Sequence, residues 1–222
     1  MGYCQGMSTL AGMLLMYMDE EESFWGLSIL LSDKKFAMHG LFIVGFPKLS
    51  RFLAHHDQIL TKFLPKVKKH FDSCNLDSIL YSLKWFFVVF VERIPFALCL
   101  RVWDIYLMDG EKVVTAMAYT ILRLHKTKLL KLRDMDSIVH YLQVKLQHDF
   151  GFSDDFVIKM LEQCSEELRK AKLDLPATAT EIELPQKPFG VFVEPTKEEK
   201  IGHRKSDFTS IEKEVTETVL LK

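Results

Sequence analysis

The chain has 222 residues, of which 48% are hydrophobic, 12% aromatic and 27% charged. These values lie near the globular average, so the chain can bury a substantial core and wholesale disorder is excluded. Twenty-nine Lys and Arg against thirty Asp and Glu give a net charge of -1, which excludes the strongly basic balance of a nucleic-acid binder. The longest apolar run, Trp85–Val91, is far shorter than the roughly 20 residues needed to span a bilayer. Any membrane contact is therefore expected to be peripheral.

Cysteine and histidine usage gives no sign of a metal site. The four cysteines are widely spaced, without a C-x-x-C pair, and with no signal peptide visible they are predicted to be reduced cytosolic thiols. The eight histidines, including the adjacent His55 and His56, show no metal-ligand spacing, so surface or capping roles are predicted for them. The G-x-x-x-x-G-K-[ST], G-x-G-x-x-G, G-x-S-x-G and H-E-x-x-H motifs are absent. Neither nucleotide binding by the chain itself nor conventional hydrolase chemistry is expected, and no cofactor or metal is predicted.

The first half of the chain has helical periodicity. Apolar residues recur at steps of three and four between Met7 and Met18, with Ser8 as a candidate cap. Acids at 19–22 precede an apolar stretch at 24–31, as the helix dipole favours. A loop rich in small residues follows, Pro47 opens a helix that runs to Leu64, and Pro65 restarts it toward Phe71.

The periodicity stays helical to residue 173. Asp77 is predicted to cap a central apolar helix from Ile79 to about Ile94, and Pro95 to start a helix over 96–108 in which Arg101 and Asp104 can pair. Further helices are predicted over 113–132, 137–146 and 154–173, and no alternating strand with a hairpin signal competes with them. The predicted fold class is all-α.

Composition changes after Asp174. Four of the seven prolines lie in residues 174–222, mixed with Glu, Lys and Thr and with few clusters of core-forming residues. We therefore predict one folded domain over residues 1–173 and a largely disordered, proline- and charge-rich tail over 174–222.

Two segments carry a family resemblance. Tyr3-Cys4-Gln5-Gly6-Met7 places an amide on a glycine-flanked loop before a helix, and by itself it is compatible with a simple solvated turn. A later block, Trp85 to Gly110, contains a tryptophan, a proline and the sequence Arg-Val-Trp-Asp at 101–104. Together and in this order they resemble the Y-x-Q motif and the R-[VI]-W-D-x-x-[LF]-x-x-G block of TBC-domain proteins, the GTPase-activating proteins of Rab GTPases. Between residues 2 and 176 the chain is most similar to the RN-tre-like branch.

The resemblance implies a multi-helix Rab-GAP domain and a role for two residues. Gln5 maps onto the glutamine finger, which orients the attacking water in trans, and Tyr3 onto the tyrosine that supports the finger loop. The implied protein is an activator rather than an enzyme in its own right. GTP and Mg²⁺ belong to the partner, a Rab small GTPase, and the implied location is cytoplasmic or peripheral on Golgi, endosomal or other vesicle membranes. The oligomeric state and the particular Rab are not predicted.

The chain departs from the family pattern in one respect. The family's arginine finger lies in an I-x-x-D-x-x-R motif before Y-x-Q, and these 222 residues contain no such motif. We therefore expect the C-terminal portion of a TBC domain, N-terminally truncated and weak or inactive alone, with exposed apolar surface. Two alternatives stay open: a non-catalytic Rab-binding or scaffold module (a pseudo-activator), and an incomplete gene model without independent function.

Overall fold

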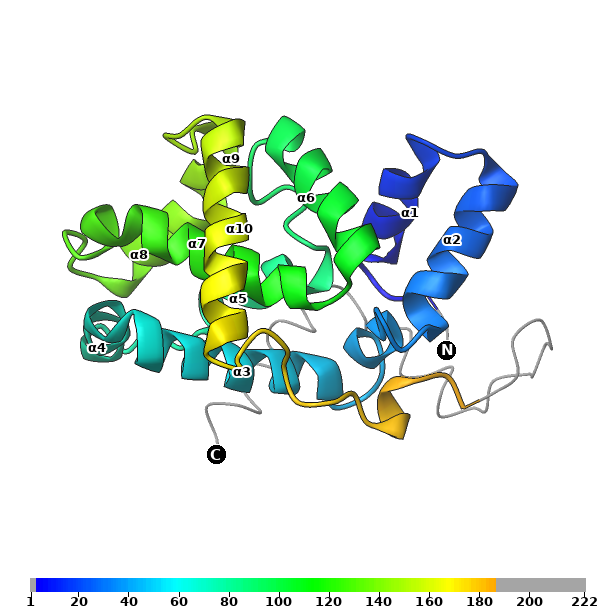
Figure 1. The fold of residues 1–222 in the computed structure, drawn as a ribbon, viewed down its shortest axis with the longest axis horizontal. Coiled ribbons are helices and arrows are strands. Elements are labelled where there is room, and N and C mark those ends of the chain that lie inside the picture. The colour runs from blue at the N-terminus through cyan, green and yellow to red at the C-terminus, as the bar shows by residue number, and fades with distance from the viewer. Residues whose placement is uncertain (1–2, 187–222) are drawn as a thin grey trace. The chain divides into compact units, whose positions relative to one another are not determined.

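The computed structural model describes residues 3–186 (Figure 1), and residues 1–2 and 187–222 lie outside the described range. Within residues 3–186 the secondary structure is helical, without a strand, as predicted. The described residues divide into two compact units, 3–49 with 179–186, and 50–178. No helix of the described part is long and apolar enough to cross a membrane.

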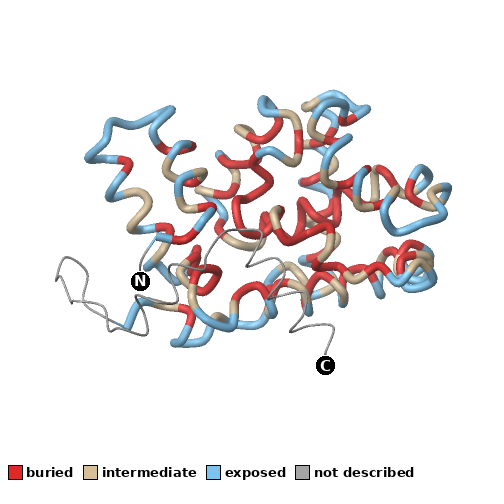
Figure 2. The backbone as a smooth tube through the Cα atoms, turned by 180° about the vertical axis from the view of Figure 1, so that it is seen from behind, coloured by how far each residue is buried: buried red, intermediate tan, exposed pale blue. Residues whose placement is uncertain are grey.

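The first unit is built on a pair of helices. Its elements are α1 (Met7–Leu15), α2 (Glu20–Ser32), the 3-10 helix η1 (Met38–Leu41) and the 3-10 helix η3 (Glu181–Glu183). Helix α1 packs against α2, and the residues that join them are exposed, pale blue in Figure 2. Asp19 caps α2 by accepting a 2.8 Å hydrogen bond from the Glu22 N–H, which confirms the predicted acidic start.

The chain returns to the first unit at its C-terminal end. There η3 packs on η1, and Glu183 is only 1% exposed. Thr180 and Glu183 form a capping box, in which the Thr180 N–H donates to Glu183 Oε1 at 3.3 Å. This packed segment corrects the predicted start of the tail at residue 174. The rest of the predicted tail, 187–222, lies outside the described residues.

The second unit contains most of the buried backbone, red in Figure 2. Its helices are α3 (Pro47–Phe63, which begins in the first unit), α4 (Pro65–Ser73), α5 (Ile79–Phe87), α6 (Phe96–Asp109), α7 (Lys112–Leu129), α8 (Met135–His140), α9 (Leu146–His148) and α10 (Asp154–Lys170). Helix α10 packs along α7 and also against α6 (Figure 1). The starts that were predicted at Pro47, Pro65 and Pro95 are confirmed.

Two predicted helices have different bounds. The helix expected over 79–94 ends at Phe87, because Val89, Phe90 and Glu92 have φ values of 48°, 64° and 59° and turn the chain. The indole N–H of Trp103 donates to the Val89 carbonyl at 3.1 Å and holds this turn. The helix expected over 137–146 instead begins at Met135 and passes into a π-helical turn, η2 (Tyr141–Lys145), before α9.

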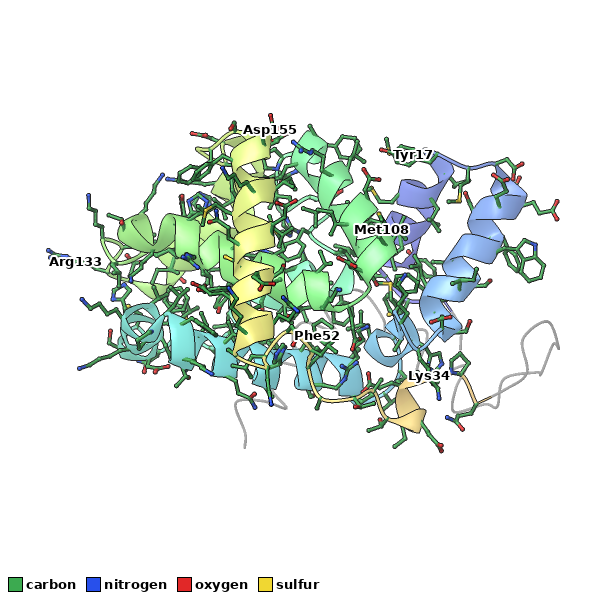
Figure 3. The ribbon with its side chains drawn as sticks, in the orientation of Figure 1. Tyr17, Lys34, Phe52, Met108, Arg133 and Asp155 are labelled. Atoms are coloured by element: carbon green, nitrogen blue, oxygen red, sulfur yellow. The ribbon has the colours of Figure 1, made fainter. Side chains whose placement is uncertain are left out.

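Several side-chain roles also differ from the predicted ones. Arg101 pairs with Asp155 at the start of α10, at 2.6 Å, rather than with Asp104 (Asp155 is labelled in Figure 3). His56 and His125 are buried instead of lying at the surface. In the interior, His56 contacts the Tyr81 hydroxyl and His125 the Tyr141 hydroxyl, each at 2.8 Å. His55 is buried as well and donates from Nε2 to the Leu173 carbonyl at 3.0 Å. His70, in contrast, is half-buried and contacts the Leu132 carbonyl, which lies beyond the end of α7.

Candidate functional site

The Y-x-Q segment forms the loop that leads into α1. Its side chains alternate in exposure: Tyr3 and Gln5 are exposed, whereas Cys4 and Gly6 are buried. A hydrogen bond of 3.1 Å from the Met7 N–H to the Cys4 carbonyl closes the turn. The Cys4 side chain therefore points inward, and residue Gln5 is exposed.

Gly6 sets the direction of this loop. It precedes α1 with φ 103° and ψ −28°, a conformation that side-chain-bearing residues rarely adopt. Its carbonyl accepts the Leu10 N–H at 3.2 Å, so Gly6 is the N-cap of α1. The predicted cap, Ser8, is wrong: Ser8 lies inside the first turn, and α1 has no side-chain cap.

Tyr3 bridges the loop to the helix. Its hydroxyl is 3.2 Å from Ser8 Oγ, across the four residues, Cys4 to Met7, that form the turn. The Tyr3 side chain is itself 62% exposed, so this is a surface contact. The contact ties Tyr3 to the first turn of α1, and the role that the resemblance implies for Tyr3 stays a prediction. Ser8 is its partner, which the residue spacing alone did not reveal.

Cys4 anchors the loop rather than acting as a nucleophile. Burial raises the pKa of its thiol above the ordinary value, and a backbone hydrogen bond from Gln5 opposes that shift only in part. The thiol is therefore protonated near neutral pH, and the thiolate is the reactive form of cysteine. The accessible chemistry of the loop rests on the Gln5 carboxamide.

A carboxamide offers one acceptor oxygen and two donor hydrogens, so Gln5 can accept from a water and donate to a second oxygen. The side chain stands at the N-terminal end of α1, where the helix dipole contributes partial positive charge. Such a group can orient a water molecule, but it carries no charge of its own. The loop alone does not supply a cation that would neutralise developing negative charge.

None of the arginines between residues 3 and 186 belongs to this loop. All six belong to the second unit, whereas Gln5 belongs to the first. Four of them form ion pairs: Arg51 with Glu111, Arg101 with Asp155, Arg123 with Glu167 and Arg169 with Glu166. Arg93 donates to backbone carbonyls, and Arg133 is exposed (Figure 3).

Comparison with known proteins places this architecture in a family. The model of the Rab-GTPase-TBC domain matches residues 1–130, more than half of the chain and parts of both structural units. The chain belongs to the Rab-GTPase-TBC domain family. Two crystal structures share the fold: the Chlamydomonas flagellar RabGAP TBC domain, with a TM-score of 0.62 at 20% identity, and the Ypt/Rab-GAP domain of Gyp1p, with 0.64 at 15%.

Curated relatives agree with this assignment. The human ecotropic viral integration site 5 protein homolog is 28% identical over 171 residues, which are 77% of this chain and 21% of that protein. TBC1 domain family member 2B of Xenopus tropicalis is 32% identical over 143 residues, 64% of this chain and 15% of that protein.

The TBC chain spans only part of each of these proteins. It covers about a fifth or less of the two curated relatives. It covers 53% of the Chlamydomonas domain and 61% of the Gyp1p domain, while 73% and 77% of this chain are matched. The finer assignment to the RN-tre-like branch stays a prediction.

Proposed function

We propose that this TBC chain acts on a Rab small GTPase and supplies Gln5 in trans as a glutamine finger. The observation that carries the proposal is the loop at residues 3–7, which exposes Gln5 between the buried Cys4 and the left-handed Gly6. The family match over residues 1–130 covers this loop. Tyr3, bonded to Ser8, is the supporting residue.

Rab-bound GTP would be hydrolysed by a water molecule that attacks the γ-phosphate in line. The Gln5 oxygen would accept a hydrogen bond from that water while its N–H groups donate to a phosphate oxygen, so that the nucleophile is held in a reactive orientation. GTP and Mg²⁺ would be carried by the Rab. The chain would thus be an activator whose membrane contact is peripheral and runs through its partner.

Stabilisation of the transition state needs a second group. An arginine finger contributes roughly 10³- to 10⁵-fold to the rate in GTPase systems. The 222 residues contain no I-x-x-D-x-x-R motif, and four of the six described arginines are held in ion pairs. We therefore propose that this polypeptide alone stimulates hydrolysis weakly. Binding to a Rab without acceleration, as a pseudo-activator or scaffold, is the second candidate.

Single-turnover hydrolysis and binding measurements separate these possibilities. Across a panel of GTP-loaded Rab proteins, the 222-residue chain is expected to give a small stimulation that Gln5→Ala removes. Gln58→Ala, at an exposed position on α3, is the matched control and should leave the stimulation unchanged. Binding to the same Rab proteins is measured with GDP and aluminium fluoride, which mimic the transition state.

Each outcome has a distinct meaning. Strong acceleration that depends on Gln5 would show that a separate arginine is unnecessary. Binding of the transition-state mimic without any acceleration would favour the non-catalytic module. If the chain neither binds nor stimulates any Rab of the panel, the proposal fails for this polypeptide.

A further inference from the structure

A groove of about 270 Å³ lies within the second unit, between α6, α7 and α10. Its floor is apolar and consists of Ile105, Val113, Ala116, Leu161 and Leu168. A protein cavity of about 150 Å³ is sufficient to hold benzene. The groove therefore has room for one large apolar side chain, and it is smaller than the usual site for a drug-sized ligand.

The rim of the groove is charged. It carries four carboxylates and two cations: Asp109, Glu162, Glu166 and Asp174, with Lys112 and Arg169. Lys112 Nζ lies 3.2 Å from Asp109, and Arg169 donates to both carboxylate oxygens of Glu166 at 2.8 and 2.9 Å. Both cations of the rim are thus already paired.

Two carboxylates are left over. The side-chain carboxylates of Glu162 and Asp174 make no hydrogen bond or salt bridge with any residue between 3 and 186, although Asp174 interacts electrostatically with His55. A second hollow next to the groove shares Glu162 and Glu166 and adds Glu167 and Lys170. Glu167 is paired with Arg123 and Lys170 with Glu166, so Glu162 is the carboxylate without an ion pair there. The groove combines an apolar floor with an excess of negative charge at its rim.

We propose that this groove binds a short segment of a partner protein that presents one large apolar side chain flanked by Lys or Arg. The apolar side chain would fill the floor, and its basic neighbours would pair with Glu162 and Asp174. An acidic segment would be repelled, and an uncharged one would cover the carboxylates without compensating them. The inference concerns a site in the second unit and does not rest on the function proposed for Gln5.

Designed peptides test this proposal on the full chain. The probe is a fluorescent twelve-residue peptide with a central Phe flanked on each side by two Lys, and its binding is measured by anisotropy at low and high salt. One comparison peptide has Glu in place of the four Lys, and another has Ala in place of the Phe. We expect the first peptide to bind more tightly than the others and to weaken as salt rises.

Variants locate the site. Glu162→Lys is expected to weaken binding roughly five- to tenfold, because it reverses a rim charge. Ser165→Trp, which places a large side chain in the lining, should abolish binding. Asp136→Lys on α8 introduces the same change of charge at an exposed position outside the groove and should leave the affinity unchanged.

Three results would overturn the proposal. Equal binding of the Glu-flanked peptide would remove the electrostatic argument, and unchanged binding by Ser165→Trp would place the peptide elsewhere. The third concerns the chain's own segment Lys200–Lys205, in which Ile201 stands near three basic residues. If the combined variant Lys200→Ser, Arg204→Ser and Lys205→Ser bound the peptide more strongly, the occupant would be this segment rather than a partner.

Discussion

The guanidinium of Arg51 on α3 forms a two-point ion pair with Glu111, which precedes α7, at 2.8 and 3.0 Å. The two side chains are only 7% and 12% exposed. Arg51 Nη1 also donates to the Ala177 carbonyl at 2.9 Å. One side chain thereby joins α3, the start of α7 and the segment that follows α10.

We expect loss of either partner of this pair to be strongly destabilising. Arg51→Ala or Glu111→Ala would remove the ion-pair partner of a buried charge and should lower the free energy of unfolding by about 3 kcal/mol. The free energy of unfolding of the double variant Arg51→Met with Glu111→Leu should be closer to that of the parent chain than the value of either single variant. Urea denaturation measures all three. Lys68→Ala, which breaks the exposed pair with Asp72, is the control and should cost no more than about 0.5 kcal/mol.

Acid is expected to destabilise the second unit through two buried histidines. Burial, with a smaller effect of positive charge at His55 and Lys68, lowers the pKa of His56 to about 3. Burial and Lys128 lower the pKa of His125 to about 4, against an opposing effect of Asp149. Between the ordinary histidine pKa of 6.5 and these values, the unfolded chain binds protons that the folded chain does not.

The contribution of these two neutral histidines to the free energy of unfolding should therefore be fully present above pH 6.5, and it should be lost as the pH falls toward 4. Each histidine contributes a slope of about 1.4 kcal/mol per pH unit within this window. His125→Gln, which can still contact the Tyr141 hydroxyl, should reduce the measured slope by about one proton. Urea denaturation in steps of pH measures this slope, and Gln163→Ala at an exposed position on α10 should leave it unchanged. An unchanged slope in His125→Gln would contradict the assignment.

Gly40 allows η3 to approach η1. A Cβ atom at this position would lie 2.8 Å from Glu183 Cγ, 2.9 Å from Glu183 Cβ and 3.0 Å from Lys48 Cβ. Because Glu183 and Lys48 are both buried, we expect Gly40→Ala to cost about 1–3 kcal/mol and to loosen the segment at 179–186. Amide hydrogen exchange in that segment is the direct measurement. A Cβ atom added at Gly12 on α1 would meet no atom within 4 Å outside the backbone of its own helix. Gly12→Ala should therefore stabilise the helix by about 0.5–1 kcal/mol.

The left-handed turn after α5 offers a stabilising substitution. Glu92 is exposed and has φ 59°, a conformation that costs a residue with a Cβ about 1–2 kcal/mol. We expect Glu92→Gly to raise the free energy of unfolding by roughly 0.5 kcal/mol, after the added freedom of the unfolded chain is subtracted. Glu162→Gly, inside α10, should lower it by about 1 kcal/mol. Equal losses in the two variants would show that the turn is unstrained.

The sequence predicted where several helices begin, but it did not predict this turn. Helix starts at Pro47, Pro65 and Pro95 were predictable, because proline fits the first helical turn and lacks the N–H that a helix interior requires. The end of α5 was not, because Val89 and Phe90 are apolar residues in a conformation that their own propensities disfavour. The turn is held by Trp103, fourteen residues further along the chain.

Among the side chains discussed above, those in a contiguous motif were also predictable from the sequence, whereas a pair from distant helices was not. Gln5 and Tyr3 were found through a short motif, since a tight glycine-flanked loop has to be contiguous in sequence. The partner of Arg101 could not be found so, because Asp155 is 54 residues away and only the packing of α10 against α6 brings them together. Contacts between distant helices leave no local pattern to read.

Helix α2 carries large apolar side chains on its surface. Phe24, Trp25 and Ile29 are 58%, 51% and 52% exposed, and the rings of Phe24 and Trp25 meet edge to face at 5.4 Å. The adjoining turn adds exposed Met16 and Tyr17, of which Tyr17 is labelled in Figure 3. Clustered exposed side chains of this size favour association.

We expect the 222-residue chain to self-associate through this surface as its concentration rises. Trp25→Glu with Ile29→Glu should shift the protein toward monomer in sedimentation velocity, because two charges would then be desolvated on association. Stability should change little, since both side chains are more than half exposed. Thr61→Glu on α3 adds negative charge at an exposed position outside this surface and should leave self-association as it was. A chain that is monomeric at all concentrations, or a double variant that associates as strongly as the parent, would contradict the prediction.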